Sequence, residues 1–139
     1  QKLIISILNQ ISLLKLAKEE AIWFFNTSDA ADISQLLTDK PDVVVTDGSN
    51  PLRWFISGCK GEMNTVNPSQ VVDTTGAGDA FTAGLLAQMI LNGSSVFESR
   101  EVTSMVTFAA ACGALVCEGP GAINPQPTFE EVQTFLRHV

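Results

Sequence analysis

The sequence has few of the residues that several common active sites require. Its single histidine, His138, lies next to the last residue, so a Ser-His-Asp triad or any other mechanism that needs a histidine finds little support in it. The three cysteines, Cys59, Cys112 and Cys117, are odd in number, lack Cys-x-x-Cys spacing and stand among apolar residues. We therefore expect free, buried thiols in a reducing compartment rather than disulfides or zinc ligands.

Positive charge is also scarce. Eight Lys and Arg residues stand against 15 Asp and Glu, and the basic residues are scattered. A nucleic acid or an anionic membrane would need a clustered basic face, so neither is expected as a partner. Polar residues interrupt the apolar runs before they reach membrane-spanning length, and the start lacks a signal-peptide pattern. These features predict a cytoplasmic protein.

Length and periodicity indicate the fold class. A chain of 139 residues without an internal repeat can bury one core, so we expect a single structural unit. The run Val43-Val44-Val45 has no polar alternation, which fits a central strand covered on both faces. A strand at 11–16, helices from about 17 and 28, and this run predict an α/β fold with a parallel crossover. Further expected elements are an antiparallel edge hairpin (53–56 and 61–66) and helices at 80–91, from 96 or 101 to 116, and 128–136.

One stretch combines small residues with a carboxylate at the expected start of a helix: Asp73-Thr74-Thr75-Gly76-Ala77-Gly78-Asp79. The N–H groups at a helix N-terminus lack helical partners, and Gly76, Ala77 and Gly78 would let an anion approach them. Asp79 would project from the first turn. A carboxylate beside an anion site suits transfer of a phosphoryl group to a hydroxyl. The residues alone leave a second interpretation open, in which Asp79 only caps the helix.

The full string from Asp73 to Phe81, continued by Thr82-Ala83-Gly84, resembles the second signature of the PfkB carbohydrate kinases, the ribokinase-like family. The resemblance implies a three-layer, Rossmann-like α/β fold, present here in part. It implies ATP and Mg²⁺ as cofactors and a site for a monovalent cation such as K⁺. Residues 117–123 are similar to the family's loop that closes the cation and nucleotide site, and we call them the closing loop. The residues to which the resemblance assigns roles in the signature and in this loop are Asp79 as catalytic base, the backbone of Gly76, Ala77 and Gly78 as anion hole, and Asp73, Thr75, Gly119 and Gly121 as cation ligands.

Two other family motifs are matched, each with one residue that differs from the family pattern. Glu20 stands where the family's Asn-x-x-Glu has the glutamate that helps to position Mg²⁺, usually through water, although Ala17 replaces the asparagine. Its place in the first turn of a helix offers a simpler explanation, a favourable interaction with the helix dipole. Thr46 and Gly48 fit the Thr-x-Gly that contacts nucleotide phosphates and ribose, although Pro51 replaces a second glycine and an ordinary turn would explain the composition equally well.

The expected helix that ends at residue 116 is rich in small residues. In the family this helix borders the adenine pocket, so the resemblance makes Ala110 and Gly113 candidates for nucleotide contact. Ala110 stands in the place of an asparagine, so one polar contact to the base is lost. Tight helix packing is the alternative explanation.

The resemblance covers residues 1–139 but only the back half of a family member. It implies the C-terminal nucleotide-binding and catalytic part, without the N-terminal sugar pocket and lid, so we expect a truncated product or an expressed fragment that shows little turnover alone. The tail 122–128 is similar to bacterial fructokinases, which implies phosphorylation of a sugar hydroxyl, with sugar and ATP as partners. Two alternatives stay open: a non-catalytic nucleotide-binding or regulatory module of kinase descent, and a structural partner, for example a homodimer, that pairs through an exposed sheet edge.

Overall fold

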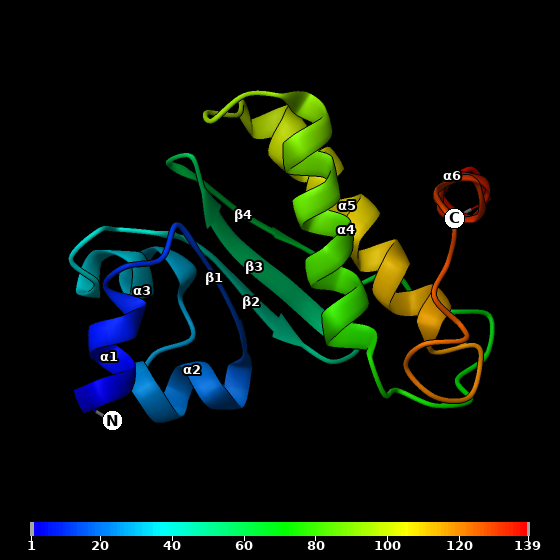
Figure 1. Cartoon of the computed structure of the whole chain (residues 1–139), viewed down its shortest axis with the longest axis horizontal. Coiled ribbons are helices and arrows are strands. Elements are labelled where there is room, and N and C mark those ends of the chain that lie inside the picture. Colours follow the sequence, from blue (N-terminus) through cyan, green and yellow to red (C-terminus); the bar gives the residue numbers. More distant parts are fainter. Residues whose placement is uncertain (1, 139) are drawn as a thin grey trace. The chain divides into compact units, whose positions relative to one another are not determined.

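The computed structural model describes residues 2–138, which divide into two compact units (Figure 1). Of the described residues, unit 1 comprises 2–65 with Val96–Ser99, and unit 2 comprises Val66–Ser95 with 100–138. Each unit buries an apolar cluster of its own. The chain therefore differs from the single unit that its length suggests.

Unit 1 contains a sheet with the strand order β1-β2-β3-β4. Strands β1 and β2 are parallel, whereas β2–β3 and β3–β4 are antiparallel. The parallel pair needs a crossover, which α2 and α3 supply, and the antiparallel pairs need only tight turns. The elements of unit 1 are α1 (Lys2–Leu8), β1 (Leu13–Ala17), α2 (Lys18–Phe25), α3 (Ala30–Leu36), β2 (Asp42–Asp47), β3 (Asn50–Ile56) and β4 (Cys59–Met63).

The core of unit 1 forms where α2 and α3 cover one face of the sheet. In β1 the side chains of Leu14 and Leu16 are buried, as the period of two in a strand requires. The parallel register places them beside Val43 and Val45 of β2 on the same face. Ile33 of α3, which is fully buried, completes this contact, and each such side chain contributes about 1.5–3 kcal/mol.

The sheet differs in detail from the one expected. The valine run lies in β2 as predicted, but β3 pairs with it directly, so Pro51 lies inside a strand and not in a loop. Residues 64–66, expected in a strand, lie beyond the end of β4. The prediction of Trp54 as a core residue is confirmed at 4% exposure. Its indole lies over Gly61, because a Cβ at that position would collide with the ring.

Unit 2 is helical. Its elements are α4 (Ala77–Asn92), α5 (Ser99–Val116), whose first residue belongs to unit 1, and α6 (Phe129–Leu136). The expected ends are confirmed for α4, whose cap Gly93 has a φ of +64°, and for α6, where Thr128 and Glu131 form a capping box. Among the described residues, no helix is both long and apolar enough to cross a membrane.

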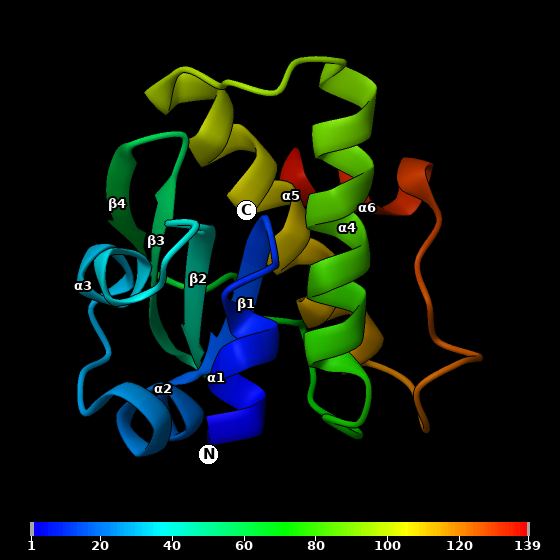
Figure 2. The same cartoon turned by 60° about the vertical axis from the view of Figure 1, so that its left-hand side comes forward.

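Helices α4 and α5 run side by side (Figures 1 and 2). They approach closely because Gly84 has no side chain, and a Cβ there would lie 2.7 Å from the sulfur of Cys112 and 3.2 Å from the Cα of Ala109. The thiols of Cys112 and Cys117 are free and buried as expected, whereas Cys59 is partly exposed. Burial raises the pKa of the Cys112 thiol to about 11, so the thiol stays protonated at neutral pH.

Ser34 of α3 gives a test of the core of unit 1. The residue is fully buried, and its hydroxyl has no hydrogen-bond partner among the described residues. We expect Ser34→Ala to raise the free energy of unfolding by about 0.5–2 kcal/mol, since it removes an unpaired buried hydroxyl and favours the helix. Urea unfolding followed by circular dichroism measures the change. Ser104→Ala, at an exposed position of α5, is the control for helix propensity alone, and a loss of stability in Ser34→Ala would contradict the prediction.

Candidate functional site

The start of α4 depends on Gly76. This residue is the N-cap of the helix and has a φ of +85°, a left-handed conformation that favours glycine. A Cβ at this position would lie 2.7 Å from the Cβ of Ala122 and 2.9 Å from its Cα. Both the backbone and the lack of space therefore require glycine where the chain enters the helix.

The backbone donors at this helix start are partly engaged. The N–H of Ala77 donates to the carbonyl oxygen of Thr74 at 3.2 Å, and that of Ala80 donates to the oxygen of Gly76 at 2.9 Å. The N–H groups of Gly76, Gly78 and Asp79 donate to no acceptor among the described residues. Free donors at the positive end of a helix can bind an anion. Of the three expected donors, those of Gly76 and Gly78 are available, whereas that of Ala77 is engaged.

Asp79 lies in the first turn of α4 and is exposed. No side chain caps this helix, so the interpretation of Asp79 as a hydrogen-bonding cap finds no support in its contacts. Its carboxylate accepts no hydrogen bond from the residues that the structure describes. An exposed, unpaired carboxylate beside free N–H groups can accept a proton from a hydroxyl that lies against a bound anion.

Asp73 joins two segments that are far apart in the sequence. Its Oδ1 accepts hydrogen bonds from the N–H and the hydroxyl of Thr75, at 2.9 and 2.7 Å. Its Oδ2 accepts one from the N–H of Gly121 at 2.9 Å. These bonds, first those from Thr75, lower the pKa of Asp73, which is therefore ionised at neutral pH.

Three of the four predicted cation ligands, Asp73, Thr75 and Gly121, are thus brought together. Gly119 belongs to the same closing loop, where a Cβ would lie 2.7 Å from the Cβ of Pro125. The three donors leave acceptor capacity on Oδ2 of Asp73, because each carboxylate oxygen can accept about two bonds. One further oxygen ligand for a cation is therefore compatible with the network.

Sequence reasoning missed a second link between the same segments. The N–H and hydroxyl of Ser69 both donate to Oε1 of Glu118, at 2.7 and 2.6 Å. The N–H groups of Val72 and Asp73 also donate to the carbonyl oxygen of Cys117. No local pattern could have indicated contacts over this sequence separation. Together they fix the segment that leads to Gly76 against the closing loop.

Ala110 and Gly113, the two predicted adenine contacts, lie in α5. Ala110 is 5% exposed, and Gly113 is buried. A Cβ at Gly113 would lie 3.0 Å from the carbonyl oxygen of Ala77, so this glycine lets α5 approach the first turn of α4. The packing explanation is sufficient for Gly113, and contact with a base stays a prediction for both residues.

Glu20 of unit 1 lies in the first turn of α2. Its Oε2 accepts the N–H of Ala17 at 2.8 Å, which is half of a capping box because the alanine side chain has no acceptor. Oε1 accepts no hydrogen bond from the described residues. Within residues 2–138, no three His, Cys, Asp or Glu side chains could hold a metal ion together. Glu20 therefore fits Mg²⁺ only as a single ligand, with water and phosphate oxygens as the others.

Thr46 and Gly48 lie at the carboxyl end of β2, and Thr46 pairs with Ala17, the last residue of β1. Gly48, with a φ of +57°, makes the turn into β3. Between them, Asp47 forms an ion pair with Lys18, whose Nζ is 2.8 Å from Oδ2. Sequence reasoning missed this pair, although a lysine and an aspartate, each two residues beyond the predicted end of one of two parallel strands, were a signal for it.

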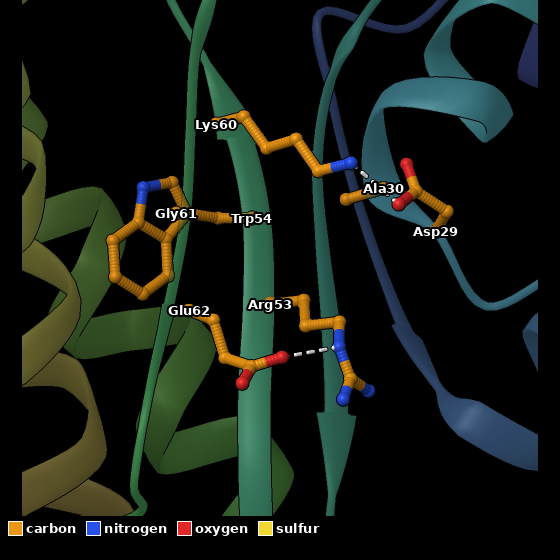
Figure 3. Close-up of a pocket in the computed structure, with 7 residues that line it drawn as sticks. All are labelled: Asp29, Ala30, Arg53, Trp54, Lys60, Gly61 and Glu62. Carbon is orange, nitrogen blue, oxygen red and sulfur yellow. Dashed lines mark hydrogen bonds and ion pairs between the residues drawn. The ribbon is translucent and has the colours of Figure 1, made fainter.

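Unit 1 also has a pocket of about 370 Å³, lined by Asp29, Ala30, Arg53, Trp54, Lys60, Gly61 and Glu62 (Figure 3). Its charged groups are paired with one another. Lys60 is 2.7 Å from Asp29, and the guanidinium of Arg53 is 2.6 Å from Glu62. None of the predicted site residues lines this pocket, and its paired charges offer no free group to a ligand.

Asp73 gives a test of the network in unit 2. An asparagine can accept through one oxygen only, so we expect Asp73→Asn to lower the thermal unfolding midpoint at pH 7. The pKa of Asp73 is lower in the folded chain than the usual value of about 3.9, so its contribution is present above that pH. It is lost as the pH falls through the folded-state pKa, where the difference between wild type and variant should disappear.

The measurement is a series of thermal melts between pH 7 and pH 3. Asp39→Asn, which alters an exposed carboxylate in a turn, is the control and should not change the midpoint at any pH. Equal midpoints for wild type and Asp73→Asn at pH 7 would contradict the assigned role of the network.

Comparison with known proteins shows similarity to carbohydrate kinases. Residues 1–129 match the model of the pfkB family carbohydrate kinases. The probable fructokinase-6, chloroplastic, of Arabidopsis thaliana is 34% identical over 137 residues, which are 96% of this chain and 35% of the relative. Fructokinase-2 of Zea mays is 32% identical over 137 residues, which are 96% of this chain and 40% of the relative. The chain thus spans less than half of the curated relatives that it matches.

Solved structures agree with this result. A fructokinase with bound ATP from Xylella fastidiosa is 29% identical and has a TM-score of 0.84. The match covers 97% of this chain and 45% of the fructokinase chain. An Arabidopsis thaliana ribokinase complexed with ribose and ATP is 29% identical and has a TM-score of 0.77. The match covers 96% of this chain and 43% of the ribokinase chain. The predicted partial ribokinase-like α/β fold is confirmed. Because the family model matches residues 1–129 of the 139 in the chain, the chain belongs to the PfkB family of carbohydrate kinases.

Proposed function

We propose that this chain is the nucleotide-binding and catalytic part of an ATP-dependent sugar kinase with fructokinase-like specificity. The observation that carries the proposal is the start of α4, where the unpaired carboxylate of Asp79 stands beside the free N–H groups of Gly78 and Asp79. Membership of the PfkB family and the fructokinase names of its relatives support it. Because the chain spans 35% and 40% of these relatives, the activity belongs to the whole protein of which it is part.

In this reaction Asp79 accepts the proton of a sugar hydroxyl, and the oxygen of that hydroxyl attacks the γ-phosphorus of ATP. The bond from the γ-phosphorus to the bridging oxygen breaks, and ADP leaves. The N–H groups of Gly78 and Asp79 hold the oxygens of the transferring phosphoryl group, on which negative charge is concentrated. One helical turn thus both accepts the proton and binds the transferring phosphoryl group.

The proposal includes two cations. Mg²⁺, held by Oε1 of Glu20 through water and by phosphate oxygens, would neutralise charge on the nucleotide. K⁺ would be bound by Oδ2 of Asp73 together with the backbone oxygens of Thr75, Gly119 and Gly121, a set supported by the hydrogen bond between Asp73 and Gly121. A fructokinase from Vibrio cholerae that is 26% identical is known in a form with fructose, ADP and calcium, which supports a divalent ion beside the nucleotide.

A second function remains a candidate. The residues Ala17 and Ala110 offer no polar side chain where the family has asparagine, and Ala110 is 5% exposed. A module that binds ATP without transferring phosphate would tolerate both losses. The acidic charge balance argues against a nucleic acid or an anionic membrane as partner for either function, and the cytoplasmic location and the homodimer stay predictions.

Asp79→Asn is the test of the proposed chemistry. In the full gene product we expect this substitution to lower kcat by about 10²–10⁴-fold, because the amide cannot accept the proton. The affinity for ATP should stay nearly unchanged. A coupled assay of ADP release with fructose, ribose and adenosine as acceptors measures turnover.

Asp32→Asn is the matched control, since Asp32 is also an exposed carboxylate in the first turn of a helix. It should leave turnover at the wild-type level. If Asp79→Asn keeps full turnover, the proposed role of the base is wrong. If the wild-type gene product binds ATP but phosphorylates none of the acceptors, the non-catalytic function becomes the better explanation.

A further inference from the structure

The Lys18–Asp47 ion pair lies where the proposed function needs the nucleotide phosphates. Strands β1 and β2 end side by side, with Ala17 paired to Thr46. Lys18 and Asp47 directly follow these two residues, and their charged groups meet at 2.8 Å. Both side chains belong to unit 1, and that of Asp47 is only 14% exposed, against 39% for Lys18.

Asp47 poses an electrostatic problem for this loop. It stands between Thr46 and Gly48, the two residues proposed to contact a nucleotide. The hydrogen bond from Lys18, with a smaller contribution from Asn50, lowers the pKa of Asp47, so that its carboxylate is ionised at neutral pH. An unpaired carboxylate beside a triphosphate would repel it over distances up to about 8–10 Å at moderate salt.

Two basic groups act on Asp47, and they are not equivalent. Lys18 makes the direct hydrogen bond, whereas Arg53 acts only at longer range. The guanidinium of Arg53 is itself paired with Glu62 at 2.6 Å. Lys18 is therefore the group whose removal would leave the carboxylate of Asp47 uncompensated.

We propose that Lys18 is the counter-ion that makes the Thr46–Gly48 loop compatible with a nucleoside triphosphate. It neutralises Asp47, so that the loop presents its backbone to the phosphates without a net negative charge. The hydroxyl of Thr46 itself donates to the carbonyl oxygen of Leu16 at 3.4 Å. This inference rests on the proposed function, since it assigns a further residue to the same nucleotide site. Lys18 acts through Asp47 and not by contact with the reacting atoms.

A purely mechanical link between α2 and β2 would give a different pattern of variants. Breaking such a link from either side would weaken nucleotide binding to a similar extent. Charge compensation is asymmetric, because Lys18→Met leaves an unpaired carboxylate whereas Asp47→Asn removes the repulsive group. The effect should also grow with the number of phosphates on the ligand.

The experiment measures the binding of ATP, ADP and adenosine to the full gene product, the same protein as in the Asp79 test, by titration calorimetry at fixed ionic strength. We expect Lys18→Met to weaken ATP binding about three- to tenfold, ADP binding less, and adenosine binding not at all. Asp47→Asn should bind ATP as tightly as the wild type or more tightly. The double variant should lie within about twofold of the wild type, because neither charge remains.

The matched control is Lys60→Met. Lys60 forms an ion pair of the same kind with Asp29, at 2.7 Å in the same unit, but lies in the pocket of Figure 3, which contains none of the proposed nucleotide contacts. This variant should bind all three ligands like the wild type. A loss comparable to that of Lys18→Met would show that any removed lysine weakens binding and would overturn the inference.

The remaining outcomes also decide. Equal losses in Lys18→Met and Asp47→Asn, or losses independent of phosphate number, overturn charge compensation while the proposed function stands. If Lys18→Met does not fold, Asp47→Asn decides alone, since weaker ATP binding by it contradicts the inference and unchanged or tighter binding supports it. Absence of ATP binding by the wild-type full gene product overturns the nucleotide site and the inference together.

Discussion

The proposed chemistry of unit 2 depends on one backbone turn, at Gly76. The left-handed φ of +85° turns the chain into α4, and the absence of a Cβ lets Ala122 of the closing loop pack against it. Because Asp73 and Glu118 tie that loop to the approach segment, a side chain at position 76 would have to displace a loop held by several hydrogen bonds. The direction of the free N–H groups and the position of Asp79 therefore follow from a steric constraint and not from a flexible loop.

The sequence predicted best the features that local chemistry determines. The capping box of Thr128 and Glu131 and the end of α4 at Gly93 follow from residues within one turn, and both are confirmed. The division into two units and the place of Pro51 inside β3 could not be predicted in this way. Both depend on which strands pair, and pairing is decided by contacts between residues far apart in the sequence.

The candidate site shows the same limit. Asp79 was singled out first from the residues at a helix start and then by resemblance to the family, Glu20 and Thr46 by resemblance alone, and the roles of all three stay predictions. The structure adds what motifs cannot give, for example the hydrogen bond from Gly121 to Asp73 and the engagement of the N–H of Ala77 by Thr74. The Lys18–Asp47 pair lies between these cases, because the parallel register that brings its members together was already implied by the strand-helix-strand pattern.

The carboxyl ends of β1 and β2 also show how the chain compensates for Ala17, which stands where the family has asparagine. Ala17 cannot supply the amide that would help to fix Glu20, but its backbone N–H holds one oxygen of that carboxylate at 2.8 Å. A carboxylate tied at one oxygen samples fewer rotamers, so the other oxygen is held in place before a cation arrives. The next residue, Lys18, binds the loop that carries Thr46 and Gly48. Backbone capping and an ion pair thus order the segment in which a side-chain amide is missing, and the loss of that amide alone is weak evidence against catalysis.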